Sequence, residues 1–157
     1  MKRTLNCKGK LIDLNEPKVM GILNITPDSF YDKSRFSTND DLLKRTETML
    51  SEGATFIDVG AYSSRPGAEF VSEEEERKRL IPALENILKE FPDVLLSVDT
   101  FRSNIARETI DLGASMINDI SGGDMDSEMF DVVVNKQVPY ILMHMRGNPH
   151  TMSNLNN

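Results

Sequence analysis

Polar side chains stand at the ends of five short apolar runs in this sequence. These residues are Asn24, Asp58, Asp99, Asn118 with Asp119, and His144. A carboxylate accepts two hydrogen bonds, and an amide both donates and accepts. The pair Asp99 and Asn118 therefore suits the edge of a planar heterocycle that carries an amino group beside a ring N–H. Any one of these residues could be an ordinary helix cap, but five in succession favour a binding site.

Further positions could bind charged groups. Asn24, Thr26 and the hydroxyls around them offer neutral oxygens that suit Mg²⁺ or a phosphate. Arg65 lies in the segment SSRPG, where it can bind an anion through two parallel hydrogen bonds or form a surface ion pair. Pro66 shapes that segment into a tight turn. The only two histidines, His144 and His150, are six residues apart, a spacing that does not place two metal ligands on one helical face.

Amphipathic segments alternate with the apolar runs, which predicts the order β-α-β-α-β-α-β-α-β. Strands are expected over 18–25, 55–59, 94–98, 116–118 and 140–143, and helices over 40–52, 72–90, 102–112 and 127–135. Pro82 predicts a kink or break near Ile81. The alternation indicates parallel strands, either in an open doubly wound sheet or in part of a (β/α)8 barrel. In both folds, function lies at the carboxyl ends of the strands.

Composition restricts the class of protein. The 157 residues suffice for one domain with a hydrophobic core. The formal net charge of −7, without a basic tract, argues against binding to nucleic acid or to an anionic membrane. No apolar run approaches the ~20 residues that span a bilayer, and no signal peptide is recognisable, so a cytoplasmic protein is expected. The single cysteine, Cys7, excludes an internal disulfide.

Two long motifs and three short ones resemble those of dihydropteroate synthases, in the order of that family. The long motifs are MGILNITPDSF at 20–30 and the segment 53–68, which contains GATFIDVG and SSRPGA. The short motifs are SVDT at 97–100, INDISGG at 117–123 and MHMRGNP at 143–149. The resemblance implies a TIM barrel that uses Mg²⁺ to condense a dihydropterin-methyl diphosphate with 4-aminobenzoate. The family is also the target of sulfonamide inhibitors.

The resemblance implies a role for each matched residue. Asn24 is expected at the Mg²⁺ and the diphosphate, and Asp99 and Asn118 at the pterin edge. Asp32 is expected on a first loop that orders over the reaction. The aminobenzoate pocket, which sulfonamides share, is expected to contain Phe30, Ser64, Arg65 and Pro66. The remaining expected substrate contacts are Thr26, Asp58, Ser63 and Met143.

The chain departs from the family in its first loop and in its length. Asp32-Lys33-Ser34 replaces the common Asp-Gly-Gly, which predicts a stiffer loop. Five strands and four helices make only the amino-terminal part of a barrel that typically needs ~250 residues. We therefore expect residues 1–157 to form a single, incomplete pterin-binding domain with two open sheet edges and no synthase activity by itself. Because the sheet does not close, the side chains of Leu23, Val98 and Ile117 are expected to be partly exposed.

Two alternative functions remain at this stage. A methyltetrahydrofolate-binding methyltransferase would share the barrel and the pterin edge, but it does not need the TPDSF and SSRPG segments. An inactive pterin-binding fragment would need only the residues at the pterin edge. The resemblance also implies a homodimer for full-length members of the family, with contacts mainly in carboxyl-terminal helices that this chain lacks.

Overall fold

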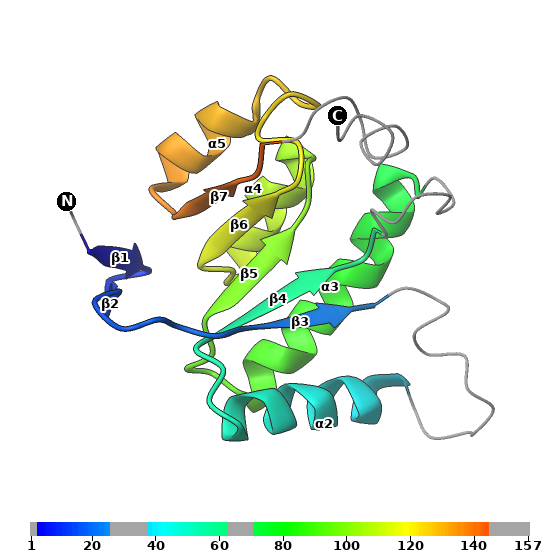
Figure 1. Ribbon diagram of the computed structural model, residues 1–157. Coiled ribbons are helices and arrows are strands. Elements are labelled where there is room, and N and C mark those ends of the chain that lie inside the picture. Colours follow the sequence, from blue (N-terminus) through cyan, green and yellow to red (C-terminus); the bar gives the residue numbers. More distant parts are fainter. Residues whose placement is uncertain (1–2, 26–37, 63–70, 145–157) are drawn as a thin grey trace, which may run out of the picture.

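A five-stranded parallel sheet organises the described part of the chain. The structure, a computed structural model, describes residues 3–25, 38–62 and 71–144 (Figure 1). The strands are β3 (Met20–Asn24), β4 (Phe56–Gly60), β5 (Leu96–Asp99), β6 (Met116–Asp119) and β7 (Tyr140–Leu142). The helices are α2 (Thr38–Ser51), α3 (Glu73–Glu90), α4 (Ser103–Leu112) and α5 (Met129–Lys136). The predicted alternation of strands and helices is confirmed.

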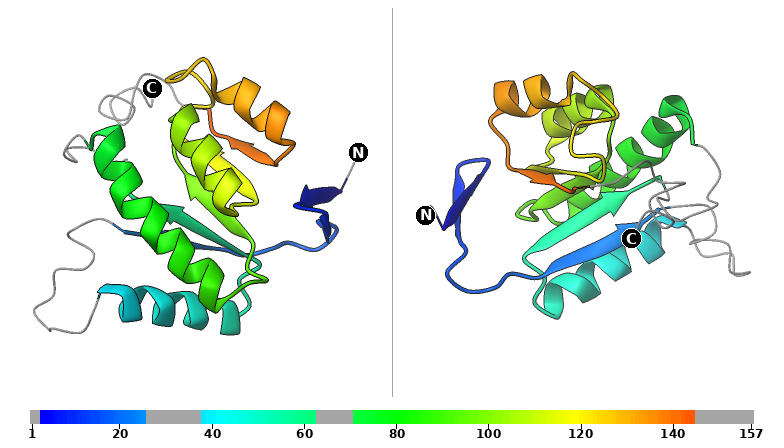
Figure 2. Two further views of the ribbon diagram at one scale, coloured as in Figure 1. Left: turned by 180° about the vertical axis from the view of Figure 1, so that it is seen from behind. Right: turned by 45° about the horizontal axis from the view of Figure 1, so that its top comes forward.

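The order of the strands decides between the two predicted architectures. The sheet runs β3-β4-β5-β6-β7, in chain order and without a reversal. An open doubly wound sheet would reverse its order and carry helices on both faces. Here α3 and α4 lie behind the sheet in Figure 1 and in front of it after a half turn (Figure 2). The arrangement is that of consecutive βα units of a barrel, in which β3 and β7 are the two edges.

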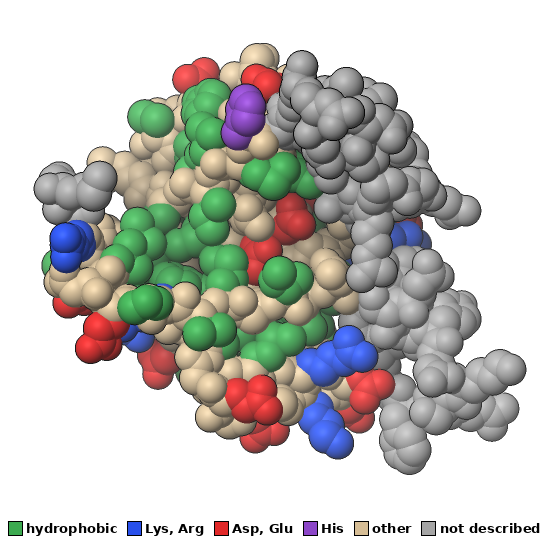
Figure 3. Space-filling view, in the orientation of Figure 1, with side chains coloured by type: hydrophobic (Ala, Val, Ile, Leu, Met, Phe, Trp, Pro, Cys, Tyr) green, Lys and Arg blue, Asp and Glu red, His purple; other side chains and the backbone are tan. Residues whose placement is uncertain are grey.

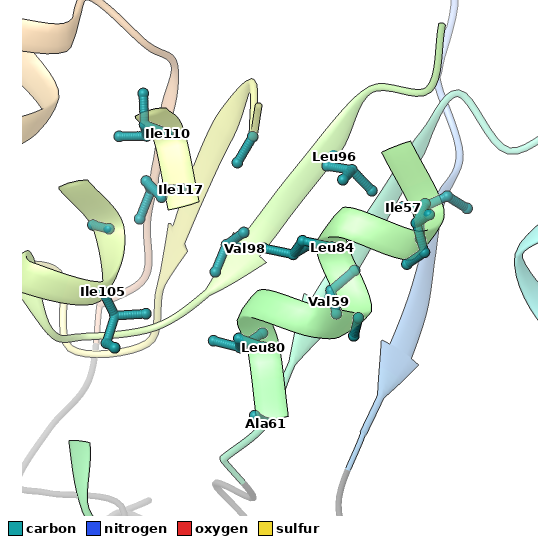
Figure 4. Packing of buried hydrophobic residues seen from close by; sticks show 14 of the residues in the cluster. Ile57, Val59, Ala61, Leu80, Leu84, Leu96, Val98, Ile105, Ile110 and Ile117 are labelled. Carbon is teal, nitrogen blue, oxygen red and sulfur yellow. The ribbon is translucent and has the colours of Figure 1, made fainter. Parts of the chain in front are cut away.

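The outer face of the sheet forms the hydrophobic core with the helices. Val59 and Val98 belong to one apolar cluster with Leu80 and Leu84 of α3 (Figure 4). Every residue of β4 is buried, as expected for a central parallel strand.

The prediction that Leu23, Val98 and Ile117 are partly exposed is wrong, because their exposed fractions are 1%, 0% and 0%. Side chains alternate along a strand, and these three point toward the helices, which are present. The open barrel instead exposes inner-face residues near the edges. Ile22 of β3, for example, has an exposed fraction of 63%.

Helix α3 is continuous across its proline. Its first turn carries four glutamates, and the hydroxyl of Ser72 accepts a hydrogen bond from the Glu75 N–H at 3.2 Å, as the sequence predicts for the cap. A break near Ile81 is absent, since the helix spans Glu73–Glu90 with Pro82 inside it. Proline removes one backbone hydrogen bond, and the buried side chains on both sides of it keep the helix packed.

A short β-hairpin precedes the sheet, and the sequence analysis missed it. Strands β1 (Thr4–Cys7) and β2 (Lys10–Asp13) pair antiparallel. Lys8 and Gly9 join them, both with positive φ, as a tight hairpin turn requires. Cys7 and Ile12 pack in one cluster with inner-face residues near the amino ends of the barrel strands, namely Phe56, Leu95 and Met116. The hairpin thus covers the end of the sheet opposite to the predicted site.

Candidate functional site

Inner-face side chains from four strands meet at the carboxyl edge of the sheet. The register places Asn24 opposite Gly60, Gly60 opposite Asp99, and Asp99 opposite Asn118. Residues in register on parallel strands point to the same face, so Asn24, Asp99 and Asn118 project together. One row below lie Asp58 and Ser97, which also oppose each other. We refer to Asn24, Asp58, Ser97, Asp99 and Asn118 as the inner-face cluster.

Gly60 allows the side chains of Asn24 and Asp99 to approach each other inside this cluster. A Cβ atom at Gly60 would lie 3.2 Å from Cβ and 3.3 Å from Oδ2 of Asp99, and 3.6 Å from Oδ1 of Asn24. The side chains of Asn24 and Asp99 therefore pack closely over the glycine, and a larger residue at this position would push Asp99 away. The sequence analysis treated Gly60 only as the end of a strand. The signal that could have revealed its role is a glycine inside a buried strand, which commonly marks a close approach to a ligand.

Asp58 and Asn118 form a buried pair with unused hydrogen-bonding capacity. Asn118 donates from Nδ2 to Oδ2 of Asp58 at 3.0 Å, which leaves Asn118 Oδ1 free to act as an acceptor. Asp58 Oδ1 and Ser97 Oγ are buried and have no hydrogen-bond partner among the described residues. Burial raises the pKa of Asp58, and the Ser97 hydroxyl and the Asn118 amide beside it oppose part of that rise. Buried polar atoms without partners are rare in folded proteins, so Asp58 and Ser97 mark a polar region of the sheet that the fold alone does not explain.

Asp99 titrates close to neutral pH. Burial raises its pKa to about 7, and the negative charges of Asp58, Glu76 and Asp119 contribute to the rise. A ligand that donates N–H groups to this carboxylate would stabilise its ionised form and lower the pKa again. Perturbed carboxyl groups of this kind concentrate at functional sites. In Figure 3, acidic side chains come to the surface in the middle of the inner face, with hydrophobic side chains around them.

Asp119 belongs to a different structure from its neighbour Asn118. It points to the helix face, is completely buried, and accepts hydrogen bonds from the backbone N–H and the hydroxyl of Ser121, from the Gly123 N–H and from the Tyr140 hydroxyl. Burial raises the pKa of Tyr140, and so do the hydrogen bond from its hydroxyl to Asp119 and the negative charge of that carboxylate. We refer to Asp119, Ser121, Gly123 and Tyr140 as the turn cluster, which fixes the connection from β6 to α5.

The structure locates some of the predicted site residues and leaves others outside its description. It brings together Asn24, Asp58, Asp99 and Asn118. Met143 is partly exposed just beyond β7, and its N–H donates to the Asp119 carbonyl at 3.3 Å. His144 is exposed. The predicted residues Thr26, Phe30, Asp32, Ser63, Ser64, Arg65 and Pro66 lie outside the described residues, as does the departure at Lys33-Ser34.

The fold and the inner-face cluster define a class: an α/β protein of the barrel type, with a polar site for a small heterocycle at the carboxyl edge of its sheet. Residues 20–157 match the family described as "Pterin binding enzyme", and the chain belongs to that family. This match confirms the resemblance that the motifs carry.

Proteins and structures similar to the chain come from several kingdoms. It is 48% identical to the mitochondrial folate synthesis bifunctional protein of Arabidopsis thaliana, covering 100% of this chain and 29% of that protein. It is 47% identical to the dihydropteroate synthase of Synechocystis, over 87% of this chain and 47% of that protein. The Xanthomonas albilineans dihydropteroate synthase, solved with 4-aminobenzoic acid, superposes with a TM-score of 0.85 at 39% identity, over 94% of this chain and 53% of that one. The Yersinia pestis dihydropteroate synthase, solved in a sulfonamide complex, superposes with a TM-score of 0.86 at 42% identity, over 98% of this chain and 55% of that one.

The chain therefore spans about half the length of these single-function synthases, and less of the bifunctional proteins. The predicted partial barrel is confirmed by the superpositions. Among the described residues, no helix is long and apolar enough to cross a membrane.

Proposed function

We propose that this chain forms the pterin-binding half of a dihydropteroate synthase, which joins a dihydropterin-methyl diphosphate to 4-aminobenzoate and releases diphosphate. The observation that carries the proposal is the inner-face cluster around Gly60, where an ionisable carboxylate and an amide project side by side from adjacent strands. Such a pair matches the donor and acceptor pattern of a pterin edge. The names of similar proteins, and the 4-aminobenzoic acid bound by one of them, support it.

The residues of the chain would act by binding and orienting the pterin. Ionised Asp99 would accept two N–H groups of the heterocycle. Asn118, held by Asp58, would present its carbonyl oxygen to a further donor. In the reaction, the bond between the pterin methylene carbon and the diphosphate oxygen breaks, and its electron pair leaves with the diphosphate. The aromatic amine then forms the new C–N bond and loses a proton. Orientation of the methylene carbon toward the amine is the contribution expected from this half of the barrel.

Mg²⁺ is the proposed cofactor, with Asn24 as its ligand from this chain. The amide oxygen of Asn24 lies beside Gly60 and is a neutral, hard ligand, which fits this ion. The described residues contain no group of three or more His, Cys, Asp or Glu that could hold a metal ion together. A single neutral oxygen from the chain, that of Asn24, fits Mg²⁺, because this ion commonly keeps several waters and binds substrate phosphates. When bound, the ion would neutralise charge on the departing diphosphate.

Further parts of the proposal rest on the family motifs. Phe30, Ser63, Ser64, Arg65 and Pro66 would form the aminobenzoate pocket, which sulfonamide inhibitors would also occupy. Thr26 would contact the substrate, Asp32 would lie on a first loop that orders over the reaction, and Met143 would contact the pterin. A homodimer is proposed for the full-length protein, and a cytoplasmic location for its activity.

Substitution of Asp99 tests the proposal. In the longest natural form of the protein that contains these residues, Asp99→Ala should weaken pterin binding by more than ~2 kcal/mol, because the N–H groups of the ligand lose their acceptor. Isothermal calorimetry with pterin measures this loss. Asp93→Ala, at an exposed carboxylate before the opposite end of β5, is the matched control and should leave the affinity unchanged. Equal pterin affinity in the wild type and Asp99→Ala would disprove the assignment.

Residues 1–157 alone are proposed to bind pterin weakly and to have no turnover. Within the described residues, β3 and β7 are open edges, and Ile22, Leu142 and Met143 leave apolar surface uncovered. Light scattering should show self-association of this span, and a diphosphate-release assay should show no product. A monomer with the turnover of a full-length relative would contradict both expectations.

A further inference from the structure

A buried ion pair lies between the first turn of α3 and the turn after β5. Glu76 is completely buried, and its Oε2 binds Nη1 of Arg102, whose side chain is nearly as buried. The Thr100 hydroxyl donates to Oε1 of Glu76 at 2.6 Å, and the Arg102 backbone N–H donates to that hydroxyl oxygen at 3.2 Å. Both carboxylate oxygens of Glu76 are thus occupied by the residues that directly follow Asp99.

Arg102 also contacts two segments on either side of the pair. Its Nη2 donates to the Val71 carbonyl at 2.5 Å, just before α3. Its guanidinium carbon lies 5.8 Å from the centre of the Tyr62 ring and 4.8 Å from that of Phe101. The two rings meet edge to face at 5.3 Å. Tyr62 stands two residues after Gly60, so one arginine connects the end of β4, the start of α3 and the end of β5.

Stability alone is a weak explanation for this arrangement. Burial of two charges carries a large desolvation cost, and apolar replacements of similar volume are often as stable. Burial raises the pKa of Glu76, and the bonds from Thr100 and Arg102 oppose that rise. An ion pair makes hydrogen bonds of defined direction, and an apolar contact makes none. Here the hydrogen bonds hold Thr100 and the Arg102 N–H just after Asp99, and the guanidinium lies against the ring of Tyr62, two residues after Gly60.

We propose that Glu76 and Arg102 are positioning residues, which hold the ends of β4 and β5 so that Asp99 lies over Gly60 in its binding orientation. Neither residue touches the ligand in this role, because both lie on the helix side of the sheet, whereas the inner-face cluster opens on the other side. The role deepens the proposed function and rests on it, since the group that is positioned is the proposed pterin acceptor.

The test removes the pair without leaving a lone buried charge. The double variant Glu76→Gln with Arg102→Met keeps the approximate volume of the two side chains. It is compared with the wild type in the longest natural form of the protein. We expect a melting temperature close to that of the wild type. We expect the affinity for pterin, measured by calorimetry, to fall about tenfold, because small displacements of binding groups are costly. The matched control is Glu108→Gln with Arg77→Met, a half-exposed pair that also joins α3 to α4.

A second variant separates geometry from charge and guards against a failure to fold. Arg102→Lys keeps the charge beside Glu76 but loses the planar fork that reaches Val71. This variant should fold, and it should bind pterin more tightly than the double variant does. A purely structural role would predict no such gain when the two variants have equal melting temperatures. Wild-type affinity in both Arg102 variants would overturn the inference, as would an equal loss in the control pair. If the wild type itself does not bind pterin, the proposed function fails instead.

Discussion

Asn118 and Asp119 are neighbours in β6, yet they belong to regions with opposite properties. In the turn cluster, Asp119 is completely buried and receives four hydrogen bonds from described residues. In the inner-face cluster, Asp58 is almost as buried, yet its Oδ1 lacks a partner among the described residues. A satisfied buried carboxylate stabilises the fold, whereas an unsatisfied one lowers stability and keeps bonding capacity for a ligand. The difference separates a structural acid on β6 from a proposed functional acid on β4.

The largest effect on stability is expected in the turn cluster, where the buried carboxylate of Asp119 has hydrogen-bond partners. Asp119→Ala would leave the Tyr140 hydroxyl and the N–H groups of Ser121 and Gly123 without their acceptor. The free energy of unfolding should fall by about 3 kcal/mol, since bonds to a buried charge are strong and the orphaned donors stay buried. Urea denaturation measures this change. Asp124→Ala, an exposed acid in the same turn, should change the free energy by less than about 0.5 kcal/mol.

Gly60→Ala tests the close packing of Asn24 and Asp99 in the inner-face cluster. The added methyl group would lie 3.2 Å from Cβ of Asp99 and displace its carboxylate. We expect pterin affinity to fall at least about tenfold, a cost of ~1.4 kcal/mol, with a smaller loss of stability from crowding. Calorimetry and thermal melting measure the two effects. Gly53→Ala is the control for the methyl group alone, because a Cβ there meets no atom within 4 Å, although its positive φ adds backbone strain. Unchanged pterin affinity in Gly60→Ala would show that binding does not depend on the position of Asp99 over Gly60.

The pKa of Asp99 predicts how stability depends on pH. Its folded value of about 7 lies above the ordinary value of 3.8, so the folded state holds a proton that the unfolded state releases between these values. The contribution of Asp99 is therefore most favourable below pH 3.8, and it is lost as the pH rises toward 7. Asp99→Asn should remove this slope and raise the free energy of unfolding at pH 8, because no charge is then buried there. Denaturation between pH 4 and pH 8 checks both the slope and its sign, and an unchanged slope would contradict the assignment.

The smallest effect is expected from two buried serines near β5. Ser115 donates from Oγ to the Leu96 carbonyl at 3.0 Å, whereas Ser97 Oγ has no partner among the described residues. Ser115→Ala should cost about 1 kcal/mol, and Ser97→Ala should be nearly neutral for stability. A reversed order in denaturation experiments would show that Ser97 is satisfied after all.

Several errors of the sequence analysis have a common physical origin. The hairpin of β1 and β2 was missed because its strands are four residues long and mostly exposed, so no clear hydrophobic period marks them. Pro82 predicts a break that packing overrides. Leu23, Val98 and Ile117 were assigned to the wrong face, because a run that is apolar throughout does not show which positions face the barrel interior.

The sequence by itself determined the alternation of strands and helices, the motifs of the family, and the short list of polar residues at the strand ends. Periodicity, caps and apolar runs are local properties, so they can be read along the chain. The tertiary structure alone decided which of those polar residues face one another. It separated Asn118 from Asp119, placed Gly60 between Asn24 and Asp99, and brought Glu76 to Arg102. These relations depend on strand register and on contacts between residues distant in sequence, and a one-residue shift in register would reverse the face of every side chain on a strand.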